Sequence, residues 1–129
     1  MRILLVEDDP TVREFIVSLL DRGGHEVEAV ENGDVALGIY KDRKPPYDLV
    51  LTDIGHPGLD GIELADKIRQ IEPFQCIAFQ TGSTAARVAE RIKTSGVNDI
   101  PHLAKPFSVE QLLQFVEWVV ANAGKSRRV

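Results

Sequence analysis

YDLVLTDIGHPGLDG, residues 47–61, combines a short β-prone run with an abrupt stop. The apolar run Leu49–Leu51 has the length of a buried strand, and Asp53 closes it. The glycines and the proline of the following GHPG interrupt regular structure, so the chain is expected to turn into solvent there. In an open parallel sheet, ligands bind at the carboxyl ends of the strands. Asp53 is therefore a candidate site residue, although a strand-end aspartate often only caps a turn.

Four other β-prone runs and five helical patterns accompany this segment. The other strands are expected over residues 3–6, 25–30, 76–79 and 103–104. Helices are expected from residue 10 to the Gly23–Gly24 pair, then over about 34–41, 61–71 and 85–95, and after Ser108. Strand and helix alternate along the chain, which predicts an α/β fold with a doubly wound five-stranded parallel sheet, covered by helices on both faces.

The first and last helices each carry one apolar stripe. Asp9 and Pro10 suit an N-cap followed by proline at the first helical position. The inward residues expected in the first helix are Val12, Phe15, Ile16, Leu19 and Leu20. Those expected in the last helix are Val109, Leu112, Leu113, Val116, Val119 and Val120. At about 100° per residue, Trp118 lies far from the second stripe and should be exposed, with Phe115 at the edge of that stripe.

The composition is that of one globular domain. The 129 residues are 43% hydrophobic and 27% charged, and the net charge of −5 argues against direct binding to nucleic acid, which needs a basic face. A lone Cys76 makes no internal disulfide, and neither a signal peptide nor a membrane-spanning run is visible. We therefore expect a cytoplasmic protein without membrane contact, with a domain over 1–123 and a basic tail over 124–129.

Reactive side chains stand at the ends of four expected strands. They are Glu7 and Asp8, Asp53, Thr81 and Lys105, and neighbouring strands of a doubly wound sheet bring such ends together. Three carboxylates repel one another unless a cation neutralises them, and Mg²⁺ prefers a few carboxylates with waters and a phosphate. Lysine and hydroxyl groups suit phosphoryl oxygens, and a carboxylate can attack phosphorus. The sequence therefore predicts a phosphoryl-transfer site.

At this point the chain resembles the receiver domains of two-component response regulators over essentially its whole length. The resemblance rests on four segments in order: ILLVEDDP, LVLTDIGHPGLDG, FQTGS and LAKPF. It implies a flavodoxin-like three-layer sandwich with strand order 2-1-3-4-5 and five helices. It also implies a signalling phosphoacceptor that catalyses only its own phosphorylation and dephosphorylation, rather than an enzyme acting on other molecules.

The resemblance also assigns roles around a divalent ion, Mg²⁺ or Mn²⁺. Glu7 and Asp8 become the acidic metal-binding pair, with Asp8 the direct ligand. Asp53 becomes the phosphoacceptor and a further metal ligand, and the carbonyl of Gly55 completes the protein's share. The same resemblance makes Thr81 the switch hydroxyl.

Lys105 would pair with the phosphoryl group, followed by a cis bond to Pro106. The chain departs from the family pattern at His102, where family members usually carry a larger aromatic switch residue. The stretch 96–105 is also longer than usual, and His56 stands where methionine is common.

The family resemblance implies a histidine kinase or phosphotransfer protein as phosphodonor, and an effector protein or output domain downstream. The output face would combine the helix expected over 85–95, the fifth strand and the last helix, with Phe115 and Trp118 as candidate contacts and as a surface for a homodimer.

Two other functions share this fold. A flavodoxin-type ligand module needs a phosphate cradle after the first strand, where the acidic residues 7–9 would instead repel phosphate. A pseudo-receiver, acting by contact without phosphorylation, remains open because of His102 and the longer loop.

Overall fold

The computed structural model describes residues 1–42, 46–55, 58–82, 90 and 99–126, with residues 123–126 described by their backbone only. Its sheet contains β1 (Arg2–Val6), β2 (Glu26–Val30), β3 (Leu49–Asp53), β4 (Ile77–Thr81) and β5 (His102–Ala104). All pairings are parallel and the order is β2-β1-β3-β4-β5, as expected. The described helices are α1 (Pro10–Arg22), α2 (Gly33–Asp42), α3 (Gly61–Ile71) and α5 (Val109–Ser126). The helix expected over 85–95 lies outside the described residues.

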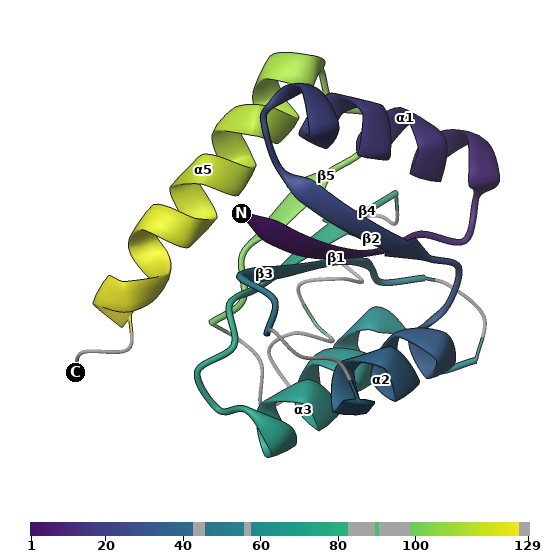
Figure 1. Ribbon diagram of the computed structural model, residues 1–129, viewed down its shortest axis with the longest axis vertical. Helices are drawn as coiled ribbons and strands as arrows, with labels where there is room; N and C mark the ends of the chain where they lie inside the picture. Colours follow the sequence, from purple (N-terminus) through teal and green to yellow (C-terminus); the bar gives the residue numbers. More distant parts are fainter. Residues whose placement is uncertain (43–45, 56–57, 83–89, 91–98, 127–129) are drawn as a thin grey trace.

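Helices cover both faces of the sheet, which makes a three-layer sandwich (Figure 1). Alternate residues of the strands point to opposite faces. One set, which includes Ile3, Leu5 and Leu51, packs with apolar residues of α1 and α5, and we call this cluster the α1/α5 core. The other set, which includes Leu4 and Val50, packs with α2 and α3 in the α2/α3 core. Within the described ranges, no helix is long and apolar enough to cross a lipid bilayer.

Local capping explains where the helices begin. The Asp9 carboxylate accepts hydrogen bonds from the N–H groups of Thr11 (2.9 Å) and Val12 (3.2 Å), which confirms the predicted N-cap of α1. Asp60 and Glu63 form a reciprocal capping box at the start of α3. Before α5, the Ser108 hydroxyl accepts from the Gln111 N–H at 3.1 Å, and the Gln111 side chain accepts from the Ser108 N–H at 2.8 Å.

Two residues expected to face the core are exposed. Phe15 is 50% exposed because it lies about 90° around α1 from the centre of the buried trio Ile16, Leu19 and Leu20. Val109 is 41% exposed because it is the first residue of α5, and burial begins one turn later at Leu112.

The remaining expectations for α5 hold. Trp118 is 55% exposed, as its angle on the helix predicts, and Phe115 is half-buried. The helix continues to Ser126, into the segment expected to begin the basic tail.

The two phenylalanines Phe79 and Phe15 provide a test of this packing. Phe79, on β4, is fully buried in the α2/α3 core, and truncation would leave a cavity. Phe79→Ala should lower the free energy of unfolding by roughly 3–5 kcal/mol, whereas Phe15→Ala should change it by less than about 0.5 kcal/mol. Urea denaturation followed by circular dichroism measures both. Comparable losses in the two variants would contradict the placement of Phe15 outside the core.

Candidate functional site

Charged side chains from three strand ends meet at the carboxyl edge of the sheet. The Lys105 ammonium lies 2.6 Å from Glu7 Oε1 and 3.2 Å from Asp53 Oδ2. Glu7 is fully buried, Asp53 is buried, and Lys105 is half-buried. The sequence prediction that these strand ends converge is therefore confirmed by the geometry.

Strand alternation explains why these carboxylates lie side by side. Leu49 and Leu51 contribute to the α1/α5 core, so Asp53, two residues further along β3, projects from the same face. On β1, Ile3 and Leu5 face the α1/α5 core, and Glu7, two residues after Leu5, projects from the same face. Val6 pairs in register with Thr52, so the next residues along the two strands, Glu7 and Asp53, are neighbours.

The acidic residues fit a hard divalent cation. Carboxylate oxygens of Glu7, Asp8 and Asp53 all lie within 4.8 Å of one another, and Asp8 is exposed towards solvent. Among the described residues, Glu7 Oε2 is buried and has no hydrogen-bond partner. A buried carboxylate oxygen without a partner is costly, and coordination of Mg²⁺ or Mn²⁺ would satisfy it.

The pKa values of Glu7 and Asp53 are shifted in opposite directions. Burial and the neighbouring Asp53 carboxylate raise the pKa of Glu7 to about 7, against the opposing effect of Lys105. Burial also disfavours ionised Asp53, but the hydrogen bond with Glu7, the Lys105 charge and the Gly55 N–H together lower the pKa of Asp53. Burial likewise disfavours charged Lys105, and its two carboxylate partners outweigh that effect and raise the pKa of Lys105. Asp53 is thus the ionised carboxylate near neutral pH.

Comparison with known proteins identifies the family. The sequence pattern of the response regulator receiver domain matches residues 3–117. The chain belongs to the response regulator receiver family.

Two curated relatives show receiver domains in different contexts. The chain is 39% identical over 122 residues to the response regulator receiver protein CpdR of Brucella abortus (strain 2308), covering 95% of this chain and 98% of CpdR. It is 35% identical over 115 residues to the response regulator protein FleR of Pseudomonas aeruginosa, covering 89% of this chain but 24% of FleR. A receiver domain is thus nearly all of one relative and a quarter of the other.

A solved structure supports the same family. The response regulator protein TrrA of Thermotoga maritima, in complex with Mg²⁺–BeF, is 30% identical with a TM-score of 0.77, covering 92% of this chain and 97% of that chain.

Thr81 and Gly55, which were also predicted for the site, differ in how far they are buried. Thr81 is buried at the last position of β4, and its carbonyl accepts the Lys105 N–H at 2.7 Å. Gly55 is exposed and donates its N–H to Asp53 Oδ1 at 3.4 Å. The peptide bond between Lys105 and Pro106 is cis, as the resemblance implied.

The predicted switch position is on β5, and the predicted output residues are on α5. His102 is exposed at the first position of β5 and pairs in register with Phe79. Phe115 and Trp118 are on α5. His56 lies outside the described residues.

Asp34, which the sequence analysis missed, binds the loop after Asp53. The Asp34 carboxylate, in the first turn of α2, accepts the Leu59 N–H at 3.2 Å. Gly58 has φ +75°, and a Cβ there would lie 2.6 Å from Asp34 Oδ2. At the other end of the loop, a Cβ on Gly61 would lie 2.3 Å from the Asp53 carbonyl oxygen, so the backbone passes too close for a side chain. No periodicity marks Asp34 as part of the site, because it is 19 residues before Asp53 in the chain.

Gln80 is a further feature of this edge. It is fully buried on β4, pairs in register with Asp53, and neither polar atom of its side chain has a partner among the described residues. The sequence analysis ended this strand at residue 79, so it did not place Gln80 on the strand.

Glu7→Gln should change how stability depends on pH. Because the pKa of Glu7 is raised from 4.5 to about 7, the native protein between these values holds a proton that the unfolded chain has released. The metal-free wild type should therefore lose stability as pH rises through that range. Glu7→Gln should remove this loss, stabilise the metal-free protein at alkaline pH by at most about 3 kcal/mol, and weaken Mg²⁺ binding. Urea titrations in the presence of a metal chelator, at a pH below 4.5 and at a pH above about 7, measure the free energy of unfolding of both proteins. If that free energy changes with pH in the same way in both proteins, the prediction is wrong.

Asp34→Ala should loosen the loop that carries Gly55. It removes the acceptor of the Leu59 N–H, so Mg²⁺ affinity measured by calorimetry should fall several-fold, while unfolding changes by no more than about 1.5 kcal/mol. Asp48→Ala is a matched control, since Asp48 accepts the Arg2 N–H at 2.8 Å at the opposite end of the sheet. Equal loss of Mg²⁺ affinity in both variants would show that Asp34 has no special link to the site.

Proposed function

We propose that this receiver domain accepts a phosphoryl group on Asp53 in a reaction that depends on Mg²⁺ or Mn²⁺. The observation that carries the proposal is the placement of an ionised, buried Asp53 beside Lys105 and two further carboxylates. A histidine kinase or a histidine phosphotransfer protein is the donor. A cytoplasmic location belongs to the same proposal and agrees with a chain whose one cysteine, Cys76, cannot form an internal disulfide.

The cation would be held by the carboxylates of Asp8 and Asp53, by Glu7, and by the Gly55 carbonyl. It would neutralise charge on the phosphoryl oxygens as they approach the three carboxylates. The TrrA structure, which contains Mg²⁺–BeF, supports a cation and a phosphoryl analogue together in a relative. The unpartnered Glu7 Oε2 supports the same assignment in this chain.

The transfer itself needs few protein groups. An Asp53 carboxylate oxygen attacks phosphorus while the bond between phosphorus and the donor imidazole nitrogen breaks, and that nitrogen leaves with the bonding electron pair and is protonated. The Lys105 ammonium, now paired with Glu7 and Asp53, is close enough to take a phosphoryl oxygen as a new partner. The Thr81 hydroxyl, at the adjacent strand end, is the proposed switch group.

The output belongs to the surface formed by β5, α5 and the segment expected as a helix over 85–95. Phe115 and Trp118 are the proposed contacts for an effector protein or an output domain, His102 is the proposed switch position, and the same surface would serve a homodimer. His102 would respond less strongly than a larger ring, because a smaller side chain offers less difference in packing between two states. We also propose that the receiver domain ends at residue 123 and that residues 124–129 form a basic tail. A phosphorylation-independent role is not favoured, since the acceptor, the lysine and the acidic pair are all in place.

Phosphodonor labelling tests the acceptor. Wild type incubated with acetyl phosphate and Mg²⁺ should gain the mass of one phosphoryl group, and hydroxylamine should remove it, as expected for an acyl phosphate. Asp53→Asn should abolish the gain because an amide is a poor nucleophile. Asp66→Asn, an exposed aspartate on α3, should label like wild type.

Labelling that persists in Asp53→Asn would place the acceptor on another residue. An unlabelled wild type that nevertheless binds Mg²⁺ would favour the pseudo-receiver instead.

A further inference from the structure

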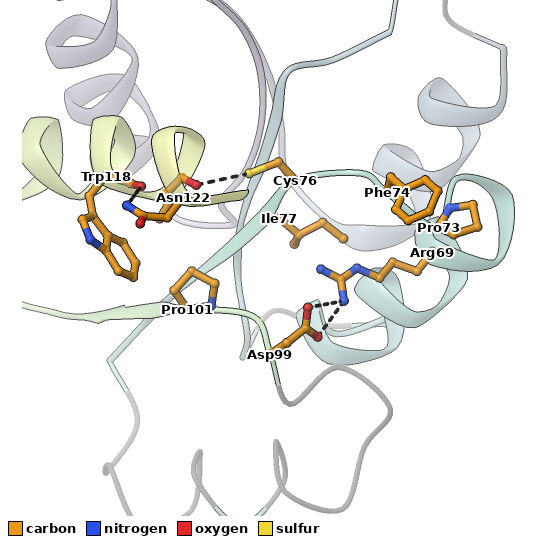
Figure 2. Close-up of a pocket in the computed structure, with 10 residues that line it drawn as sticks. Arg69, Pro73, Phe74, Cys76, Ile77, Asp99, Pro101, Trp118 and Asn122 are labelled. Atoms are coloured by element: carbon orange, nitrogen blue, oxygen red, sulfur yellow. Dashed lines mark hydrogen bonds and ion pairs between the residues drawn. The ribbon is translucent and has the colours of Figure 1, made fainter. Parts of the chain in front are cut away.

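A pocket of about 360 Å³ opens at the end of the sheet opposite to Asp53 (Figure 2). It lies between the end of α3, the starts of β4 and β5, and the second half of α5. Its lining comprises Arg69, Pro73, Phe74, Cys76, Ile77, Asp99, Pro101, Trp118, Val119 and Asn122. Because α3 and β4 contribute to it, this pocket extends beyond the output surface proposed above, with which it shares Trp118.

The two most exposed large apolar side chains of the described residues line this one pocket. Phe74 is 61% exposed and Trp118 is 55% exposed, and they stand on opposite sides of the opening (Figure 2). They come from segments 44 residues apart in the chain, so their proximity does not follow from local sequence. Exposed aromatic residues that gather around a concavity are typical of binding sites, unlike single exposed residues.

An ion pair fixes the polar part of the pocket. Arg69 Nη1 lies 2.7 Å from Asp99 Oδ1 and 2.9 Å from Asp99 Oδ2. The Arg69 side chain is 21% exposed, and a guanidinium has five N–H donors, so Arg69 can also donate to a carbonyl of a bound segment. The Asp99 side chain remains 52% exposed.

Within the part of the chain that the structure describes, the charged groups at the opening are Arg69, Asp99 and the neighbouring Glu72, so carboxylates outnumber the guanidinium. Asp99 neutralises Arg69, and Glu72, whose carboxylate accepts the Phe74 N–H at 3.2 Å, adds a further negative charge beside the aromatic rim. The whole chain carries a net charge of −5. A positively charged partner is therefore attracted to this end of the molecule, and a second copy of the chain is repelled.

We propose that this pocket is a docking site for a protein segment that inserts one apolar side chain flanked by basic residues. The inserted side chain fills the space between Ile77 and Val119, and the flanking basic groups face Asp99 and Glu72. A backbone carbonyl of the segment accepts from Arg69. A small molecule that only fills the pocket would leave the outer faces of Phe74 and Trp118 in water, whereas a longer segment covers both.

The test uses capped synthetic peptides and the isotope-labelled protein. KKAFAKK should shift the backbone amide signals of residues that line the pocket and leave those near Asp53 unchanged. KKAAAKK, which lacks the apolar side chain, and EEAFAEE, which reverses the charge, should each bind at least about tenfold more weakly. Since phosphorylation plays no part in this binding, the outcome is independent of the function proposed for Asp53.

Matched variants locate the binding. Phe74→Ala and Trp118→Ala should each lower the affinity of the protein for KKAFAKK by about tenfold. Phe15→Ala removes an equally exposed aromatic from α1, outside the pocket, and should bind the peptide like wild type. Each variant's amide spectrum shows whether it is folded, and Arg69→Lys gives a second, conservative probe that should weaken binding without removing charge.

Four results would overturn the proposal. Equal binding of KKAAAKK would mean that charge alone attracts the peptide, and equal binding of EEAFAEE would exclude a basic partner. Equally tight binding of the isolated compound N-acetylphenylalaninamide would assign the pocket to small molecules. Self-association in sedimentation experiments that Trp118→Ala abolishes and Phe15→Ala preserves would assign it to a second copy.

Discussion

The Lys105 ammonium holds the functional edge of this receiver domain together. Glu7 and Asp53 are buried neighbours of like charge, and neither would be tolerated there without a cation or a shared proton. Lys105 joins them although it lies 98 residues after Glu7 in the chain. The contact therefore links the first strand, the central strand and the last strand in one arrangement. The stability of this edge and the proposed reactivity of Asp53 depend on the same three charges.

Part of this arrangement was predictable from sequence because it rests on local rules. Asp9 with Pro10 fixes the start of α1, and apolar runs that end in acidic or basic residues mark the strand ends. Parallel-sheet topology then brings those ends together without further information. The angle on α5 was enough to place Trp118 at the surface.

Other features depended on distances that sequence patterns do not contain. Phe15 is apolar, and only the packed structure shows that Ile16, Leu19 and Leu20 define the buried side of α1, which leaves Phe15 exposed. The link from Asp34 to Leu59 joins two elements through one hydrogen bond, which no periodicity reports. The docking pocket likewise needs the end of α3 and the second half of α5 to be adjacent, which depends on the whole sandwich.

The close passage of the chain at Gly61 has an evolutionary consequence. The backbone there runs against the Asp53 carbonyl oxygen, so main-chain atoms alone hold Asp53 close to the start of α3. At Gly58 an added Cβ would meet the Asp34 side chain, whereas any residue with a Cβ at position 61 would displace the backbone of Asp53 itself. The position of this loop most resistant to substitution is therefore one that carries no functional group.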